Sequence, residues 1–311
     1  MINDTIGVDI SKDHLDAHRM SDGASCRFAN DGPGHRAFVK WLGGTDARIV
    51  FEPTGPYHRA FERRLSDAGF ALIKVNPRQA RRFAEASGKL AKTDRMDAAM
   101  LARMGALLEL EPRPVRSSLL NDLKDLHMAR EALVKNRTAA KNRAKTLTIP
   151  ILKRHNGEQL RQIERQIRAL ETEIMAVITA DADLARRFAI LVSIPGVSAI
   201  TAFALIIDMP ELGSLENGQA ASLAGLAPVA RQSGKWTGRA FIRGGRANVR
   251  QALYMPALVA MRFNPDLRAK YQKLVAAGKP AKKAITAIMR KLLILANALI
   301  RDAREWTPQL P

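Results

Sequence analysis

Residues 6–11 read Ile-Gly-Val-Asp-Ile-Ser, and they indicate the architecture of the first third of the chain. Ile6, Val8 and Ile10 alternate with small or polar residues, and such alternation is typical of a β-strand. Asp9 therefore projects from one face of a short, buried strand. A charged side chain between apolar strand residues needs a partner that stabilises its charge, so Asp9 indicates a functional site.

A second carboxylate follows the next apolar run. Ile49–Phe51 predicts a strand over residues 47–52, because Pro53 and Gly55 interrupt the pattern directly afterwards. Glu52 therefore lies at the carboxyl end of that strand.

Asp94 and Asp97 complete a set of four. They lie three residues apart at the start of a helix predicted over residues 94–109, so both occupy one helical face near its N-terminus. Four converging carboxylates repel one another unless cations lie between them, and Mg²⁺ or Mn²⁺ takes oxygen ligands of this kind. Two such ions about 3.5–4 Å apart are the usual arrangement for phosphodiester chemistry. An isolated Asp-x-x-Asp is more often a helix cap, but the full order strand-Asp, strand-Glu, helix-Asp-x-x-Asp is that of a ribonuclease-H-like core.

The remaining elements of residues 1–112 predict an α/β domain with a mixed sheet flanked by helices. Three strands come first, as a meander, and helices then alternate with strands. We expect strands over residues 5–11, 14–20, 25–30, 47–52 and 71–75, and helices over 33–42, 57–68, 78–87 and 94–109.

Residues 113–180 follow a boundary marked by Pro112 and Pro114, and they predict a helical arm. A first helical pattern runs over 119–147, and a second follows Pro150. The second carries apolar residues in steps of three and four, which predicts a coiled-coil seam formed by Leu160, Ile163, Ile167, Leu170, Ile174 and Val177. The two helices pack as an antiparallel hairpin or against a second subunit, and a helix resting on the protein's own core is the plainer alternative. We expect the arm to be an assembly surface.

Residues 181–311 predict a mainly helical domain. Ser-Ile-Pro-Gly-Val-Ser at 193–198, followed by apolar residues 199–207, resembles a helix-hairpin-helix turn that presents backbone N–H groups to a DNA phosphate. Amphipathic helices are expected over 249–263 and 281–304.

A basic, glycine-rich stretch lies inside this last domain. Residues 231–250 hold six basic residues and no acidic one. Glycine lets a backbone approach phosphate, arginine binds phosphate through paired donors, and an indole can stack on a base. We therefore predict nucleic-acid contacts by Arg231, Lys235, Trp236, Arg239, Arg243, Arg246 and Arg250. The last three arginines would share one helical face if a helix began at Arg243, whereas a solvated loop is the plainer interpretation.

The charge of the chain points to a polyanionic partner. The 311 residues carry a net charge of +20, distributed as +2 over residues 1–112, +7 over 113–180 and +11 over 181–311. Such a surplus favours nucleic acid, with an affinity that falls as salt rises. The nearly neutral part is the one that holds the four carboxylates, as expected if metal ions bind there and other parts hold the polyanion.

The remaining composition predicts a cytoplasmic protein. The single cysteine, Cys26, excludes an internal disulfide and a cysteine-based zinc site. The sequence has no run of 18 uncharged apolar residues, so we expect no membrane span. The N-terminus carries no signal-peptide pattern.

Taken together, the motifs resemble those of the DEDD transposases of the insertion-sequence 110 family. The resemblance covers nearly the whole chain and is carried by IGVDIS, FEPTG, KTDRMDA, IPGV, GLAPVARQSG and RGGRANVRQAL. It implies a RuvC-like nuclease domain over 1–112, a coiled-coil arm over 113–180 and a C-terminal transposase domain over 181–311, in a bacterial or archaeal cell.

The resemblance also implies a mechanism. Asp9, Glu52, Asp94 and Asp97 would hold magnesium, and Ser233 would attack a DNA phosphate to form a phosphoserine link. An RNA encoded by the element would select the donor and target DNA, and the enzyme would act as a homodimer or homotetramer. None of the six histidines lies near Ser233 in the sequence, so its activation would come across space from the metal-bound carboxylates, within one chain or between two.

Two other functions stay open. One is a RuvC-type metal-dependent nuclease or junction resolvase, in which water is the nucleophile and Ser233 only helps to fold its loop. The other is a non-enzymatic, basic RNA-binding scaffold whose acidic residues cap helices.

Overall fold

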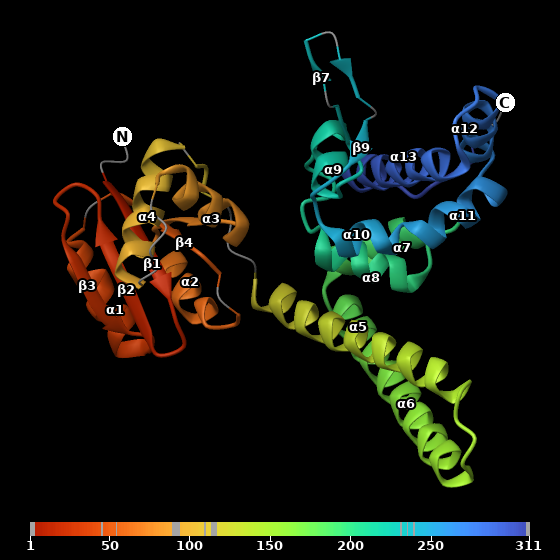
Figure 1. The fold of residues 1–311 in the computed structure, drawn as a ribbon, viewed down its shortest axis with the longest axis horizontal. Coiled ribbons are helices and arrows are strands. Elements are labelled where there is room, and N and C mark those ends of the chain that lie inside the picture. The colour runs from red at the N-terminus through yellow and green to blue at the C-terminus, as the bar shows by residue number, and fades with distance from the viewer. Residues whose placement is uncertain are drawn as a thin grey trace. The chain divides into compact units, whose positions relative to one another are not determined.

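The computed structural model describes residues 4–44, 46–53, 55–88, 94–108, 110–112, 117–230, 232–234, 236–238 and 240–308. The chain divides into two compact units, Met1–Arg116 and Ser117–Pro311 (Figure 1). The predicted arm and the predicted C-terminal domain both fall within the second unit, and the three-part division stays a prediction.

The first unit is built on a mixed five-stranded sheet. Its strands are β1 (Asp4–Ile10), β2 (His14–Arg19), β3 (Ser25–Ala29), β4 (Ala47–Phe51) and β5 (Ala71–Lys74). Their order across the sheet is β3-β2-β1-β4-β5. The first three strands pair antiparallel, whereas β4 and β5 continue the sheet in parallel with β1. The predicted meander and the mixed sheet are therefore confirmed.

Helices cover both faces of this sheet. They are α1 (Gly32–Leu42), α2 (His58–Asp67), α3 (Pro77–Ala86) and α4 (Asp94–Leu107). Phe38 of α1 and Phe61 of α2 are fully buried against the face that carries Val8 and Phe51. The helix α4 lies on the opposite face, where its Leu101 packs with the sheet residues Val50 and Ile73.

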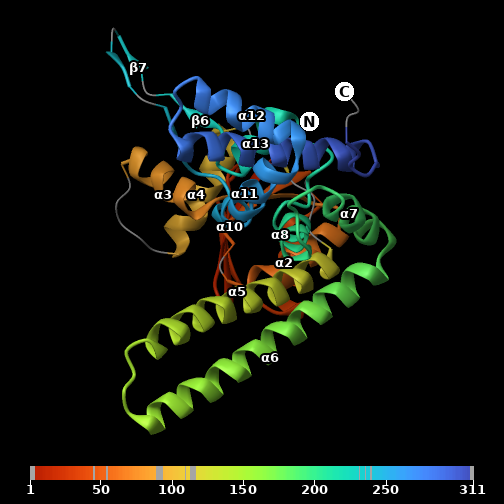
Figure 2. The same ribbon diagram turned by 90° about the vertical axis from the view of Figure 1, so that its right-hand side faces the viewer.

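Two long helices form the arm of the second unit. The helices α5 (Ser118–Ala144) and α6 (Pro150–Ala180) lie side by side as a hairpin in both views (Figures 1 and 2). Ile163, Ile167 and Ile174 are buried along the predicted seam. Leu160, Leu170 and Val177 are half-buried, and Val177 packs against the core of the unit. Ile178, which was not predicted for the seam, is fully buried beside it.

The rest of the second unit is mainly helical, as predicted. It contains α7 (Ala182–Val192), α8 (Ala199–Asp208), α9 (Asn217–Leu223), α10 (Ala247–Ala252), α11 (Tyr254–Phe263), α12 (Pro265–Ala276) and α13 (Ala281–Arg301). The helix α13 contributes Ile288, Leu292 and Leu299 to the unit's core, and all three are fully buried. The single helix expected over 249–263 is wrong: the chain forms α10 and α11 instead, because Pro256 cannot donate to the carbonyl of Ala252.

Four short strands form a narrow hairpin between α9 and α10. Strands β6 (Pro228–Val229) and β9 (Phe241–Ile242) pair antiparallel at its base, and β7 (Gln232–Ser233) and β8 (Trp236–Thr237) pair at its tip. We call residues 228–242 the serine hairpin. It extends away from the helices of its own unit (Figures 1 and 2). None of the described helices is long and apolar enough to cross a membrane.

Candidate active site

Asp9 and Glu52 lie side by side at one edge of the sheet. The strands β1 and β4 run parallel, with Val8 opposite Phe51 in their register. Asp9 is the next residue of β1, and Glu52 directly follows the end of β4. Neighbouring strands are about 4.7–4.9 Å apart. Because Val8 faces the α1–α2 side of the sheet, alternation along β1 turns Asp9 toward the α4 side. Both side chains are half-buried.

Gly7 allows α4 to pack directly on β1 at this face. A Cβ atom at Gly7 would lie 1.9 Å from the carbonyl oxygen of Ala98 and 2.3 Å from the backbone nitrogen of Ala102. Further along α4, Gly105 lies against Thr5 and Val50. The helix therefore runs opposite to β1, with its C-terminal end toward Thr5 and its N-terminal end toward Asp9.

The spacing of these contacts places the first turn of α4 near Asp9. From Gly7 to Asp9 a strand advances about 6.6 Å, and a helix covers about that distance in four residues. Four residues before Ala98 is Asp94, where α4 begins. Asp97 lies in the same turn, and its side chain is half-buried. The backbone therefore places the start of α4, with Asp94 and Asp97, near the carboxyl ends of β1 and β4, and the convergence of the four acids on one site stays a prediction.

The donor set fits a hard divalent cation. Carboxylate oxygens are the ligands that Mg²⁺ prefers, and the positive end of the α4 dipole also favours negative charge at its first turn. Within the described side chains, no three His, Cys, Asp or Glu residues converge closely enough to form a metal site. Asp9, Glu52 and Asp97 are among the described side chains, so these three do not form such a group. The side chain of Asp94 lies outside that description, and the four-carboxylate site stays a prediction.

A fifth carboxylate in this row was missed from the sequence. Asp16 of β2 lies opposite Asp9 in the antiparallel register, and Arg27 of β3 lies opposite Asp16. Arg27 donates two hydrogen bonds of 2.9 Å to Asp16, so the charge of this neighbour is neutralised. The alternating pattern of residues in β2 and β3 could have predicted these strands. Only the register between the strands shows that Asp16 lies opposite Asp9.

Ser233 lies in the second unit, at the tip of the serine hairpin. It is exposed and pairs with Trp236 across a tight turn, in which Gly234 has a φ of +56°. A left-handed residue suits the two-residue turns that join antiparallel strands. Arg231, Lys235, Arg239 and the side chain of Trp236 lie outside the described part of the hairpin.

The three remaining arginines of the predicted nucleic-acid set differ in their surroundings. They do not share one helical face, because α10 begins at Ala247 and Arg246 precedes it. Arg243 is exposed. Arg246 instead binds Glu211 through two hydrogen bonds of 2.6 and 2.7 Å and donates a third to the carbonyl of Asp208. The hydrogen bonds to Glu211 raise the pKa of Arg246.

Arg250 also binds within its own unit, to the carbonyls of Ala224 and Gly244. These carbonyls flank the base of the serine hairpin on both sides. Gly225 is in close contact there, since a Cβ atom on it would lie 2.1 Å from the oxygen of Gly244. Arg246 and Arg250 therefore anchor the hairpin in this structure, and a DNA contact by either stays a prediction.

A buried ionic cluster lies next to this anchor and was also missed. Asp208, at the end of α8, is 3% exposed and forms an ion pair with Lys124 of α5. The Nε2 atom of His127 lies 3.8 Å from the same carboxylate. Burial lowers the pKa of His127, and the charge of Asp208 opposes that shift.

The predicted helix-hairpin-helix turn joins α7 to α8. Gly196, at a φ of +97°, packs against the backbone of α11, where a Cβ atom would lie 2.8 Å from the oxygen of Pro256. Ser198 caps α8 by accepting a hydrogen bond from the nitrogen of Thr201. The glycine is therefore needed for packing, and a phosphate contact at this turn stays a prediction.

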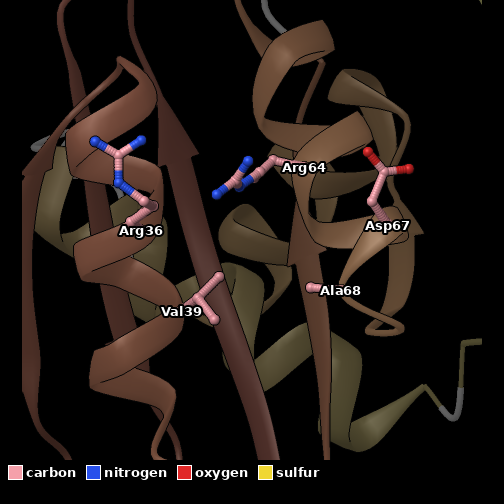
Figure 3. Close-up of a pocket in the computed structure, with 5 residues that line it drawn as sticks. All are labelled: Arg36, Val39, Arg64, Asp67 and Ala68. Atoms are coloured by element: carbon pink, nitrogen blue, oxygen red, sulfur yellow. The ribbon is translucent and has the colours of Figure 1, made fainter.

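A hollow of about 350 Å³ between α1 and α2 lies away from the acids (Figure 3). Arg36, Arg64 and Asp67 are among the residues that line it. Because α1 and α2 cover the face opposite α4, this hollow is not part of the candidate active site.

Comparisons with known proteins agree with these features. A family model of the DEDD transposases of IS110 type matches residues 6–149, and one described as the transposase IS116/IS110/IS902 family matches residues 188–272. The pilin gene-inverting proteins of Moraxella bovis and Moraxella lacunata are both 28% identical to the chain over 98% of each sequence. A 43.6 kDa protein of the insertion element IS110 from Streptomyces coelicolor is 29% identical over 53% of this chain and 40% of its own. The chain therefore belongs to the IS110/IS116/IS902 family of DEDD transposases, which are DNA recombinases.

Proposed function

We propose that this transposase cuts and rejoins DNA through a covalent link to Ser233, assisted by Mg²⁺ at Asp9, Glu52, Asp94 and Asp97. The observation that supports the proposal is the parallel register of β1 and β4, in which Val8 lies opposite Phe51 and each is directly followed by one of the two acids. The exposure of Ser233 on a narrow hairpin supports its access to a DNA strand.

The covalent step balances as a transesterification. The Ser233 oxygen forms a bond to the phosphorus, the bond from phosphorus to the 3′ oxygen breaks, and the hydroxyl proton passes to a base. The DNA 5′ end is then linked to Ser233 and a free 3′ hydroxyl remains. A 3′ hydroxyl of another strand attacks the phosphoserine and releases the serine.

The four carboxylates would hold Mg²⁺, which supplies positive charge that stabilises the phosphate as its negative charge grows. Arg243 is exposed near the base of the serine hairpin and contributes positive charge to the bound strand. Arg246 and Arg250 keep the hairpin in place through the contacts described above. Because Ser233 and the acids belong to different units, the reaction brings the two units, or two chains, to one phosphate.

We further propose that the chain acts as an oligomer on donor and target DNA, with an element-encoded RNA that selects the sites. Exchange between two duplexes involves four strands, whereas one chain carries one Ser233, so more than one chain is needed. The net charge of +20 supports binding of both nucleic acids. The similarity to two pilin gene-inverting proteins over 98% of the chain supports inversion of a DNA segment as one outcome.

Incubation with end-labelled DNA and Mg²⁺, followed by a denaturing gel, tests the mechanism. We expect DNA that migrates with the protein, that is lost in Ser233→Ala, and that persists in the control Ser222→Ala. Ser222 is exposed on α9 in the same unit. The double variant Asp94→Asn, Asp97→Asn is expected to lose all Mg²⁺-dependent cleavage.

The main competing function is hydrolysis by a RuvC-type nuclease or junction resolvase. The same paired β1 and β4 acids would serve it, with water as the nucleophile. Free DNA ends that survive Ser233→Ala would establish this alternative. Normal cleavage by the Asp94, Asp97 double variant would reject metal-assisted chemistry at these residues.

A further inference from the structure

The positive charge of the arm is concentrated at its far end. Residues 132–157 carry seven basic side chains and no acidic one: Lys135, Arg137, Lys141, Arg143, Lys145, Lys153 and Arg154. The flanking parts of the same two helices are nearly neutral, because residues 117–131 hold two basic and three acidic side chains and residues 158–180 hold three and four. We call residues 132–157 the arm tip.

These charges are exposed and almost uncompensated. Six of the seven side chains are exposed, and Arg137 is half-buried. Throughout the described arm, the one ion pair they form joins Lys141 to Glu164 at 3.8 Å, between side chains that are 58% and 41% exposed. Such a pair contributes little in water. Arg143 and Lys145 donate hydrogen bonds only to neutral amides.

Helix stability does not account for the whole pattern. Lys141 and Arg143 lie in the last turn of α5, where the helix dipole favours cations. Lys153 and Arg154 lie close after the start of α6 at Pro150, where the dipole disfavours them, and no acidic residue lies in that first turn. A partner outside the arm is therefore needed to explain why both helix ends are basic.

We propose that the arm tip binds the phosphate backbone of double-stranded DNA that flanks the site of cleavage. Clustered cations of this density match a duplex, which carries one negative charge per about 1.7 Å. A hollow of about 480 Å³ lies beside the tip. Its lining includes Arg143, His155, Gln159 and Gln162, which can donate hydrogen bonds to phosphate, together with one carboxylate, Glu158. The α6 helix has 31 residues and is about 46 Å long, so the tip reaches duplex well away from the helices of its unit (Figures 1 and 2).

The residue types favour duplex DNA over an unpaired strand or a second copy of the chain. Residues 132–157 contain no Phe, Tyr or Trp, and His155 is their one aromatic ring, so they offer few rings on which unpaired bases stack. Ile149, Ile151 and Leu152 are exposed at the tip and are the part that could instead meet protein. Two tips of this charge repel one another, which disfavours tip-to-tip pairing.

Two triple variants of the full chain test whether DNA binding depends on the charges of the arm tip or on positive charge anywhere along the arm. The first changes Lys145, Lys153 and Arg154 to Gln. The matched control changes Arg161, Arg165 and Arg168 to Gln, which removes the same charge from exposed positions nearer the root of α6. Binding of a fluorescent duplex is measured by anisotropy between 50 and 200 mM salt.

We expect the slope of log affinity against log salt to shrink by up to about 2.7 in the tip variant, at about 0.9 for each phosphate that is no longer neutralised, and by less than about 0.9 in the control. Equal effects of the two triples, or none, would overturn the proposal. A larger loss on single-stranded DNA or on RNA than on duplex DNA also overturns it. So does a fall in sedimentation mass confined to the tip variant, which would assign the surface to a second copy.

The binding assay does not depend on the catalytic proposal. It is carried out without Mg²⁺ and in a Ser233→Ala background, so a failure of serine chemistry leaves the measurement intact. Circular dichroism melts of both triples should match the parent chain, because the changed residues are exposed.

Discussion

The contact between Gly7 and α4 makes Gly7→Ala the sharpest test of how the first unit brings its acids together. The added Cβ atom would lie 1.9 Å from a backbone oxygen of Ala98, whereas real Cβ contacts are not shorter than 3.0 Å. A backbone oxygen cannot rotate away as a side chain can. The whole of α4 must therefore move from β1 by about 1 Å or more.

The cost follows from this forced shift. Overpacking of a core typically costs about 1–3 kcal/mol, and a clash with helix backbone belongs at the upper end of that range. For a unit of this size, each kcal/mol lowers the melting temperature by roughly 4–8 °C. We expect the transition of the first unit to fall by about 10 °C or more. Mg²⁺-dependent cleavage should fall as well, even at temperatures where the variant is folded, because Asp97 moves with α4.

Gly218→Ala is the matched control. Gly218 lies near the start of α9, has no atom within 4 Å of an added Cβ atom, and does not need a positive φ. We expect its melting temperature to stay the same or rise slightly, because alanine is favoured over glycine in a helix by roughly 0.5–1 kcal/mol. An unchanged melting temperature in Gly7→Ala would refute the packing of α4 on β1. A lower melting temperature with full cleavage at 20–25 °C below it would refute the link from that packing to the acids.

Two further predictions concern stability. Acidification from pH 7 to pH 5 should lower the free energy of unfolding. Burial lowers the pKa of His35, His58 and His127 in the folded chain, so the unfolded chain binds more protons and stability rises with pH. Urea titrations at three pH values measure the free energy of unfolding, and a value that does not change with pH contradicts the prediction. Arg246→Ala should destabilise the second unit by roughly 1–3 kcal/mol, because its hydrogen bonds to Glu211 are removed. Arg243→Ala, at an exposed position, should change stability by about 0.5 kcal/mol at most, and equal losses in urea denaturation would show that Arg246 is not an anchor.

Local patterns were enough to predict most of the first unit. A strand that buries one face or both leaves an apolar pattern in the sequence. The alternation over residues 6–10 and the apolar run before Glu52 are such patterns, so both strands could be predicted. The helix start at Asp94 was also predictable, since the apolar spacing begins there. The register that sets Val8 opposite Phe51, just before Asp9 and Glu52, could not be read from the sequence, because register depends on contacts between distant strands.

The second unit was less predictable, and the reason is visible at Arg246. A run of arginines and glycines shows its charge but not its partners, and Glu211 lies 35 positions away. The split between α10 and α11 depended on one proline within an otherwise continuous helical pattern. The short helices α9 and α12 have weak periodicity of their own, and contacts with α13 stabilise them.

The buried contacts of Asp208 show how ionic partners hold distant elements of the second unit together. A buried carboxylate is costly unless it is paired, and removal of one member of a buried pair typically costs about 3–5 kcal/mol. Its carboxylate binds Lys124 at the root of the arm, while its carbonyl accepts a hydrogen bond from Arg246 at the base of the serine hairpin. An apolar core could supply equal stability, but it would not fix one register between these elements. The ionic cluster therefore joins the root of the arm and the base of the serine hairpin at the same point of α8, so the position of Ser233 depends on contacts within its own unit.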